Sequence, residues 1–126
     1  MRALIVDDSS LMRKMVERAL RVAGVNLDEV FQASNGEEAL QILRREADNP
    51  AGLGLILCDI NMPVMDGLEF LEHRQRENLA VGVPVVMITT EGGKTYVLRA
   101  IAAGAGAYIC KPFFPDQIRE RVLPLL

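Results

Sequence analysis

The alternation of two kinds of segment constrains the fold of this chain more than any other feature of its sequence. Five short apolar runs rich in branched residues are separated by longer segments with helical periodicity. This alternation is typical of an α/β fold, in which helices cover a parallel sheet. We expect five strands, of which the second is the least hydrophobic and lies at an edge, while the other four are buried on both faces. The runs span residues 3–6, 29–32, 55–58, 83–88 and 107–110.

Helical spacing predicts one helix after each strand. In the first, apolar residues recur at helical intervals from Ser9 or Ser10 until Gly24 ends the segment. Asn35 and Asp66 each stand three residues before a glutamate, so each pair resembles a capping box that opens a helix. A hairpin turn is the alternative at Asn35, but the apolar spacing that follows favours a helix. The last two helices are expected around residues 96–101 and 115–122.

Length and charge exclude several classes of protein. A chain of 126 residues supports one compact core, and we expect a single domain over residues 1–126. The net charge of −3 weakens the case for nucleic-acid binding, which needs a basic face. The longest uncharged stretch, residues 78–90, is too short for a membrane span, and residues 3–6 are too short for the core of a secretory signal. We therefore expect a cytoplasmic protein that binds neither nucleic acid nor membranes.

The histidine and the cysteines offer little chemistry. With one histidine, the chain lacks the pair that a His-Glu-x-x-His zinc site requires. His73 lies in a polar run, and we interpret it as a solvated residue on a helix surface. Cys58 and Cys110 lie in apolar strand-like runs, where we expect free thiols that pack as small hydrophobic groups.

Polar residues follow four of the five predicted strands. The carboxyl ends of parallel strands meet at one edge of a sheet, so these side chains are candidates for one site. Three carboxylates and one ammonium leave a net charge of −2, and carboxylates about 4 Å apart repel by about 4 kcal/mol. Oxygen ligands without histidine or cysteine favour Mg²⁺ as the compensating ion. The candidates are Asp7, Asp8, Asp59, Thr89, Thr90 and Lys111.

Such a site suits phosphoryl transfer, in which an ionised aspartate acts as the nucleophile and forms an acyl phosphate. Lys111 would offset charge on the phosphoryl oxygens, and Thr89 could donate a hydrogen bond to one of them. Helix capping is the simpler interpretation for Asp8 or Asp66 taken alone.

Four motifs carry a resemblance to a known family. They are residues 6–13 (VDDSSLMR), residues 59–67 (DINMPVMDG), Thr89, and residues 111–113 (KPF). With these motifs in this order, the chain resembles the receiver domain of two-component response regulators, most closely the single-domain chemotaxis type. The resemblance covers essentially the whole chain. It implies a flavodoxin-like (βα)5 three-layer sandwich with strand order 2-1-3-4-5.

The resemblance also implies roles for the residues around the site. Asp59 would accept a phosphoryl group from a sensor histidine kinase or a phosphotransfer protein. Asp8, Asp59 and the backbone carbonyl of Asn61 would hold Mg²⁺, with Mn²⁺ as the alternative ion, and Asp7 would act through water. Lys111 would contact the phosphoryl group. The module would not be an enzyme, apart from its own phosphorylation and slow dephosphorylation.

The switch is likewise implied by the resemblance. Thr89 would move toward the phosphoryl group and Tyr108 would turn inward, reshaping the face of the fourth helix, fifth strand and fifth helix for a downstream target protein. From the residues alone, Tyr108 is an ordinary core aromatic. Asn61 and Glu91 would tune the loss of phosphate, and we expect a fairly short-lived phosphoryl state. The protein would be a monomer or a weak phosphorylation-dependent dimer.

Two departures from the family pattern and several alternatives remain. Phe114, before the first-turn Pro115, cannot accept a capping hydrogen bond, so the output face is expected to be more apolar there. Thr90 either reaches the phosphoryl group or faces solvent.

Two alternative functions for the chain are a receiver domain of a longer regulator and an aspartate-dependent phosphatase. A nucleotide-binding loop at residues 92–95 is excluded because Ile88 stands where the motif needs glycine.

Overall fold

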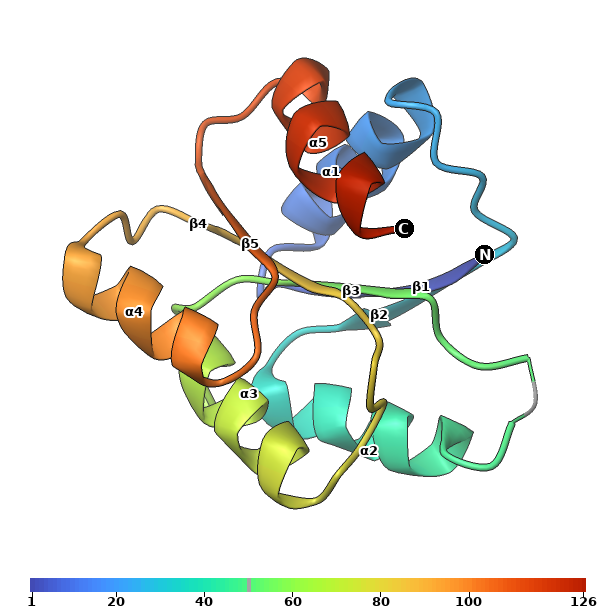
Figure 1. Cartoon of the computed structure of the whole chain (residues 1–126), viewed down its shortest axis with the longest axis vertical. Helices are drawn as coiled ribbons and strands as arrows, with labels where there is room; N and C mark the ends of the chain where they lie inside the picture. Colours follow the sequence, from blue (N-terminus) through green and yellow to red (C-terminus); the bar gives the residue numbers. More distant parts are fainter. Residues whose placement is uncertain (50) are drawn as a thin grey trace.

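Five parallel strands form one sheet in a computed structural model that describes residues 1–49 and 51–126 (Figure 1). Their order is β2-β1-β3-β4-β5, which confirms the flavodoxin-like α/β fold expected from the sequence. Each neighbouring pair is parallel, so all five strands end at the same edge of the sheet. The strands are β1 (Arg2–Val6), β2 (Glu29–Ala33), β3 (Leu55–Cys58), β4 (Val85–Thr89) and β5 (Ala107–Cys110).

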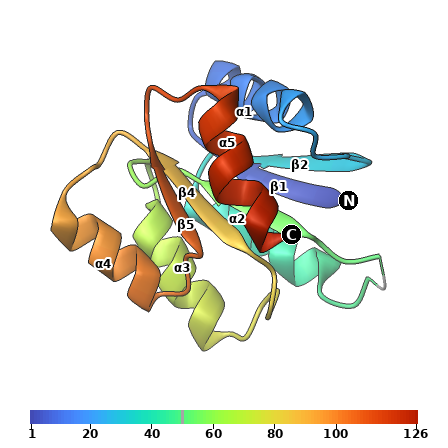
Figure 2. The same ribbon diagram turned by 45° about the horizontal axis from the view of Figure 1, so that its top comes forward.

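One helix follows each strand, and the helices lie on both faces of the sheet. α1 and α5 cover one face while α2, α3 and α4 cover the other, which gives three layers (Figures 1 and 2). The layers enclose two apolar cores, one around Leu20 and Ile118, and the other around Leu40 and Phe70. The helices are α1 (Ser10–Val22), α2 (Gly36–Glu46), α3 (Gly67–Arg76), α4 (Lys94–Ala102) and α5 (Pro115–Val122), and the last is followed by a 3-10 turn, η1 (Leu123–Leu125).

The predicted capping boxes form completely at α3 and only in part at α2. At α3, the Asp66 side chain accepts from the Glu69 N–H, and the Glu69 carboxylate accepts from the Asp66 N–H. At α2, Asn35 caps the helix by accepting from the Glu38 N–H. The reciprocal half of that box is wrong, because the Glu38 carboxylate accepts instead from the N–H and the hydroxyl of Ser34.

The burial of the strands agrees with the sequence except at β5. Strands β1, β3 and β4 lie inside the sheet and are almost wholly buried, and β2 is an edge strand as expected. The expectation that the fifth run is buried on both faces is wrong, because β5 forms the other edge, where Tyr108 is half-buried and Cys110 exposed. Both cysteines are free, and Cys58 is the one that packs in the core. β4 begins after Pro84, which has no N–H to donate to the ladder.

Two smaller expectations concern membranes and His73. None of the helices in the described part of the chain is both long enough and apolar enough to span a membrane. His73 does lie on a helix, α3, but it is half-buried rather than fully solvated.

Candidate functional site

The predicted site residues Asp7, Asp59 and Lys111 meet at the carboxyl edge of the sheet. Each is the residue directly after a strand, so its position follows from the ends of β1, β3 and β5. Backbone hydrogen bonds to the neighbouring strand continue to each of these three residues and thereby set the spacing of their side chains. These bonds join Asp7 N to Ala33 O at 3.0 Å, Asp59 N to Val6 O at 2.9 Å, and Lys111 N to Thr89 O at 2.8 Å.

The Lys111 ammonium bridges the two buried carboxylates. Its Nζ donates to Asp7 Oδ2 at 2.8 Å and to Asp59 Oδ2 at 2.9 Å. Asp7 and Asp59 are only 4% and 8% exposed, and the lysine side chain is 12% exposed. Burial works to lower the pKa of Lys111, but the hydrogen bonds and charges of the two aspartates outweigh it and raise that pKa. The lysine therefore stays charged and offsets part of the carboxylate repulsion.

Asp8 completes a group of three carboxylates. Oxygen atoms of Asp7, Asp8 and Asp59 all lie within 4.8 Å of one another, and Asp8 is exposed. Among the described residues this is the one cluster of potential metal ligands. Three carboxylates against one ammonium leave a net charge of −2, and an oxygen-only donor set suits a hard divalent cation.

Helix capping explains Asp66 but not Asp8. The cap of α1 is Ser9, whose side chain accepts from the Met12 N–H at 3.1 Å. Asp66 does cap α3. The structure thus places Asp8 in the acidic cluster, and Asp66 outside it.

A second group of predicted residues lies beside the carboxylates and is joined by hydrogen bonds. Asn61 Nδ2 donates to Glu91 Oε1 at 2.6 Å, linking the loop after β3 to the loop after β4. The Glu91 N–H donates to Thr89 Oγ1 at 3.2 Å, and the Tyr108 hydroxyl donates to the Glu91 carbonyl. Glu91 therefore connects the two residues predicted to act as the switch. Thr90 is exposed.

Tyr108 is expected to ionise well above the ordinary range. Burial, followed by the negative charges of Cys110, Glu91 and Asp59, raises its pKa from 10.0 to about 12. A Tyr96→Phe variant leaves Tyr108 as the remaining tyrosine. At pH 11 its absorbance at 295 nm should still show a protonated phenol while circular dichroism shows a folded protein.

The same pKa shift makes the stability of the fold depend on pH. Because the pKa of Tyr108 is higher in the folded than in the unfolded protein, its contribution to the free energy of unfolding is complete below about pH 10 and is lost as the pH rises to about 12. Complete ionisation of Tyr108 in the folded protein by pH 11 would contradict the half-buried, hydrogen-bonded placement of its hydroxyl.

Two residues important to this geometry had no role assigned to them from the sequence. Arg13 donates a hydrogen bond to the backbone carbonyl of Asp7, and Gly67 packs directly against the carbonyl of Asp59. Both belong to the motifs that carry the family resemblance, at residues 6–13 and 59–67, and that was the only signal available.

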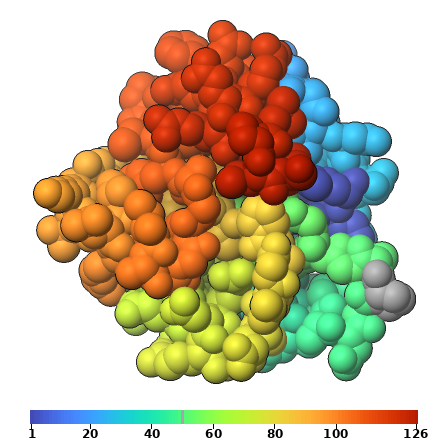
Figure 3. Space-filling model, viewed as in Figure 1, coloured from blue at the N-terminus to red at the C-terminus, as the bar shows by residue number. Residues whose placement is uncertain are grey.

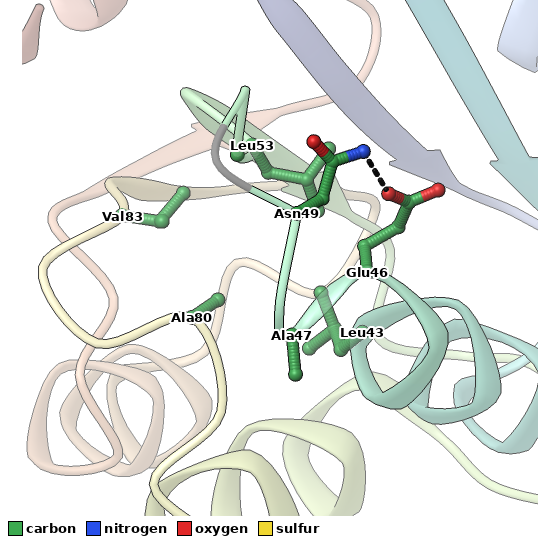
Figure 4. A pocket seen from close by; sticks show the side chains of 8 residues that line it. Leu43, Glu46, Ala47, Asn49, Leu53, Ala80 and Val83 are labelled. Atoms are coloured by element: carbon green, nitrogen blue, oxygen red, sulfur yellow. Dashed lines mark hydrogen bonds between the residues drawn. The ribbon is translucent and has the colours of Figure 1, made fainter.

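A pocket elsewhere on the molecule lacks comparable chemistry. It has a volume of roughly 130 Å³ and lies near the amino ends of β3 and β4, opposite the carboxylate cluster (Figure 4). Asn49 Nδ2 donates to Glu46 Oε2 at 2.9 Å along its wall. Its other lining side chains are apolar, so the acidic cluster remains the candidate site. The lining residues are Leu43, Glu46, Ala47, Asn49, Gly52, Leu53, Ala80 and Val83.

Comparison with known proteins identifies the family. Residues 3–123 match the family model described as the response regulator receiver domain. The chain belongs to this family. Receiver domains are phosphoacceptor signalling modules rather than enzymes, and here Asp7, Asp8 and Asp59 form the acidic pocket.

Similar proteins include several from bacterial chemotaxis. A chemotaxis protein CheY homolog of Campylobacter jejuni is 38% identical over 126 residues, which are 100% of this chain and 92% of the relative. CheY1 of Helicobacter pylori is 38% identical over 122 residues, or 97% of this chain and 94% of that protein.

Solved structures show the same likeness. CheY4 of Vibrio cholerae superposes with a TM-score of 0.82 at 34% identity, covering 99% of this chain and 98% of that one. CheY in a CheX–CheY–BeF3–Mg²⁺ complex from Borrelia burgdorferi gives a TM-score of 0.85 at 28% identity, covering 99% and 88%. The receiver fold and the likeness to CheY proteins expected from the sequence are therefore confirmed.

Proposed function

We propose that this receiver domain works in a two-component phosphorelay in which Asp59 is the phosphoacceptor. The observation that carries the proposal is the position of Asp59. Its Oδ2 lies 2.9 Å from the Lys111 ammonium, inside a cluster of three carboxylates at the carboxyl edge of the sheet. A buried carboxylate with a charged donor beside it is suited to become an acyl phosphate, and of the two that contact Lys111, Asp59 is the one that the family motif at residues 59–67 indicates.

The donor in this proposal is a phosphohistidine on a sensor kinase or a phosphotransfer protein. A P–O bond to the Asp59 carboxylate forms while the P–N bond to histidine breaks, and the released nitrogen keeps the electron pair of that bond. The Lys111 ammonium, which donates to the Asp59 carboxylate before transfer, donates to a phosphoryl oxygen afterwards, and the Thr89 hydroxyl donates to another phosphoryl oxygen. A carboxylate is itself a nucleophile, so this step needs no general base.

A divalent cation completes the site. Asp8, Asp59 and the backbone carbonyl of Asn61 would hold Mg²⁺, with Asp7 acting through water and Mn²⁺ as the alternative ion. When bound, the ion offsets negative charge on the phosphoryl oxygens. The support here is the oxygen-only donor set with its net charge of −2 and, in the Borrelia complex, the Mg²⁺ that accompanies a similar CheY.

The output proposed for this module is a binding event on α4, β5 and α5. Figure 3 shows these three segments forming one continuous surface. Tyr108 lies on β5 with its hydroxyl bonded to Glu91, so movement of Thr89 is coupled to this surface. Phe114, which is 71% exposed, adds apolar area to it, while Gln117 rather than Phe114 supplies the side-chain hydrogen bond at the start of α5.

The biological setting is proposed from the relatives. Their names place similar proteins in chemotaxis, so we propose a chemotaxis role in the cytoplasm with a protein target and no nucleic acid or membrane partner. Residues 1–126 would act as one receiver domain, either a monomer or a weak dimer once phosphorylated. Asn61 and Glu91 stand two residues after Asp59 and Thr89 and are joined by a hydrogen bond, which supports a role in tuning the loss of phosphate and a half-life well below many hours.

The test is intact-mass analysis after incubation with a small acyl-phosphate donor, with and without Mg²⁺. One phosphoryl adduct should form only with Mg²⁺ and then decay. The phosphatase alternative predicts repeated turnover of an external phosphate ester instead.

Asp8→Ala should weaken Mg²⁺ binding by at least about tenfold in a calorimetric titration, and an unchanged titration would count against the proposed metal ligands.

A further inference from the structure

Arg13 ties the loop that carries the acidic residues to two other parts of the fold. Its Nη1 donates to the backbone carbonyl of Asp7, and its Nε donates to Gln32 Oε1 at 2.8 Å. Arg13 itself lies in α1, Asp7 directly follows β1, and Gln32 is in β2. One guanidinium therefore joins three consecutive elements at the edge of the acidic pocket.

Asp7 and Asp8 are held in different ways. The Asp7 carboxylate is fixed on both oxygens, because Oδ1 accepts from the Ser9 N–H at 2.9 Å and Oδ2 from Lys111 at 2.8 Å. Asp8 is exposed, and no residue in the described ranges 1–49 and 51–126 donates a hydrogen bond to its carboxylate. The direction of the Asp8 side chain therefore depends on its backbone.

The Arg13 hydrogen bond acts on that backbone. The Asp7 carbonyl and the Asp8 N–H belong to one planar peptide unit, so fixing the carbonyl also limits the direction of the Asp8 Cα–Cβ bond. The pocket works against this placement, because Asp7, Asp59 and Lys111 together carry a net charge of −1, which repels the Asp8 carboxylate toward solvent. A donor on the Asp7 carbonyl resists that displacement from outside the pocket.

We infer that Arg13 is a positioning residue that holds the Asp7–Asp8 peptide so that the Asp8 carboxylate points toward the divalent cation. The inference rests on the proposed function, because it assumes that the acidic pocket binds Mg²⁺. Arg13 neither binds the ion nor touches the phosphoryl group. It acts only through the peptide. Groups that hydrogen-bond to metal ligands orient those ligands in a similar way in other metal sites.

Calorimetric titration of the metal-free protein with Mg²⁺ tests the inference. Arg13→Ala should raise the Mg²⁺ dissociation constant about tenfold. Lys14→Ala is the matched control, because Lys14 is the next residue of α1, carries the same charge, is exposed, and makes no hydrogen bond or ion pair among the described residues. The Mg²⁺ dissociation constant of Lys14→Ala should differ from that of the wild type by less than about twofold.

Arg13→Lys separates geometry from charge and covers the case in which Arg13→Ala does not fold. Lysine keeps the charge but cannot bond Asp7 and Gln32 through a rigid fork, so binding should fall between wild type and Arg13→Ala. The phosphorylation rate of these variants should recover at saturating Mg²⁺, as expected for a defect in binding alone.

Three results would overturn the inference while leaving the proposed function intact. They are an Arg13→Ala affinity no weaker than that of Lys14→Ala, an Arg13→Lys affinity equal to wild type, and a rate deficit that persists at saturating Mg²⁺. If wild-type protein shows no Mg²⁺ binding, the proposed metal site fails instead, and the inference fails with it.

Discussion

Asp59→Asn should form no phosphoryl adduct under conditions in which the wild-type protein gains one. The amide is a far poorer nucleophile than a carboxylate, and its nitrogen cannot form a stable acyl phosphate. Asparagine has nearly the same shape, so the contacts of this buried position with β1 and the loop after β3 should survive. Intact-mass analysis after incubation with Mg²⁺ and a small acyl-phosphate donor measures the loss directly.

Two controls define the result for Asp59. Asp116→Asn removes one carboxylate from an exposed position on α5 and should be phosphorylated like the wild type. Fragmentation of the phosphorylated wild-type protein should place the adduct on the peptide that contains Asp59. Equal phosphorylation of wild type and Asp59→Asn would show that the acceptor is another residue.

Gly67→Ala is expected to cause the largest loss of stability from the smallest change in side chain. A Cβ at this position would lie 1.9 Å from the Asp59 carbonyl oxygen, 2.9 Å from its carbonyl carbon and 3.0 Å from Ile60 Cα. All three are backbone atoms, and the Gly67 N–H also bonds the Ile60 carbonyl at 2.8 Å. Either α3 or the chain that carries Asp59 must move, at a cost of about 3 kcal/mol or more.

Chemical denaturation of Gly67→Ala and of the wild type measures the loss in the free energy of unfolding. The rate of phosphorylation of Gly67→Ala should also be lower than that of the wild type, because Asp59 is displaced. Gly92→Ala is the matched control, since its Cβ would meet only the Cys110 sulfur at an ordinary 3.4 Å. That variant should lie within about 0.5 kcal/mol of wild type. A Gly67→Ala protein as stable as Gly92→Ala would show that α3 does not pack this closely on Asp59.

Local patterns in the sequence predicted most of the fold. The order of strands and helices, the edge position of β2 and the cap of α3 by Asp66 were predicted correctly, because each depends on residues close together in the chain. The errors have two causes. An apolar run does not reveal how many neighbours its strand will have, so the exposure of β5 and Cys110 was missed. The Glu38 side chain likewise had two acceptable donors nearby, and it pairs with Ser34.

By itself, the sequence determined that Asp7, Asp8, Asp59 and Lys111 would gather at one edge of a parallel sheet, because polar residues at strand ends can meet nowhere else in such a fold. Only the tertiary structure decided how they meet. The bridge from Lys111 to Asp7 and Asp59, the contact of Gly67 with the Asp59 carbonyl and the hydrogen bond from Arg13 to Asp7 all depend on strand register and helix packing. The Lys111 bridge joins residues 104 and 52 positions apart in the chain. The two shorter-range contacts depend on how α3 and α1 pack, and no local pattern contains that information.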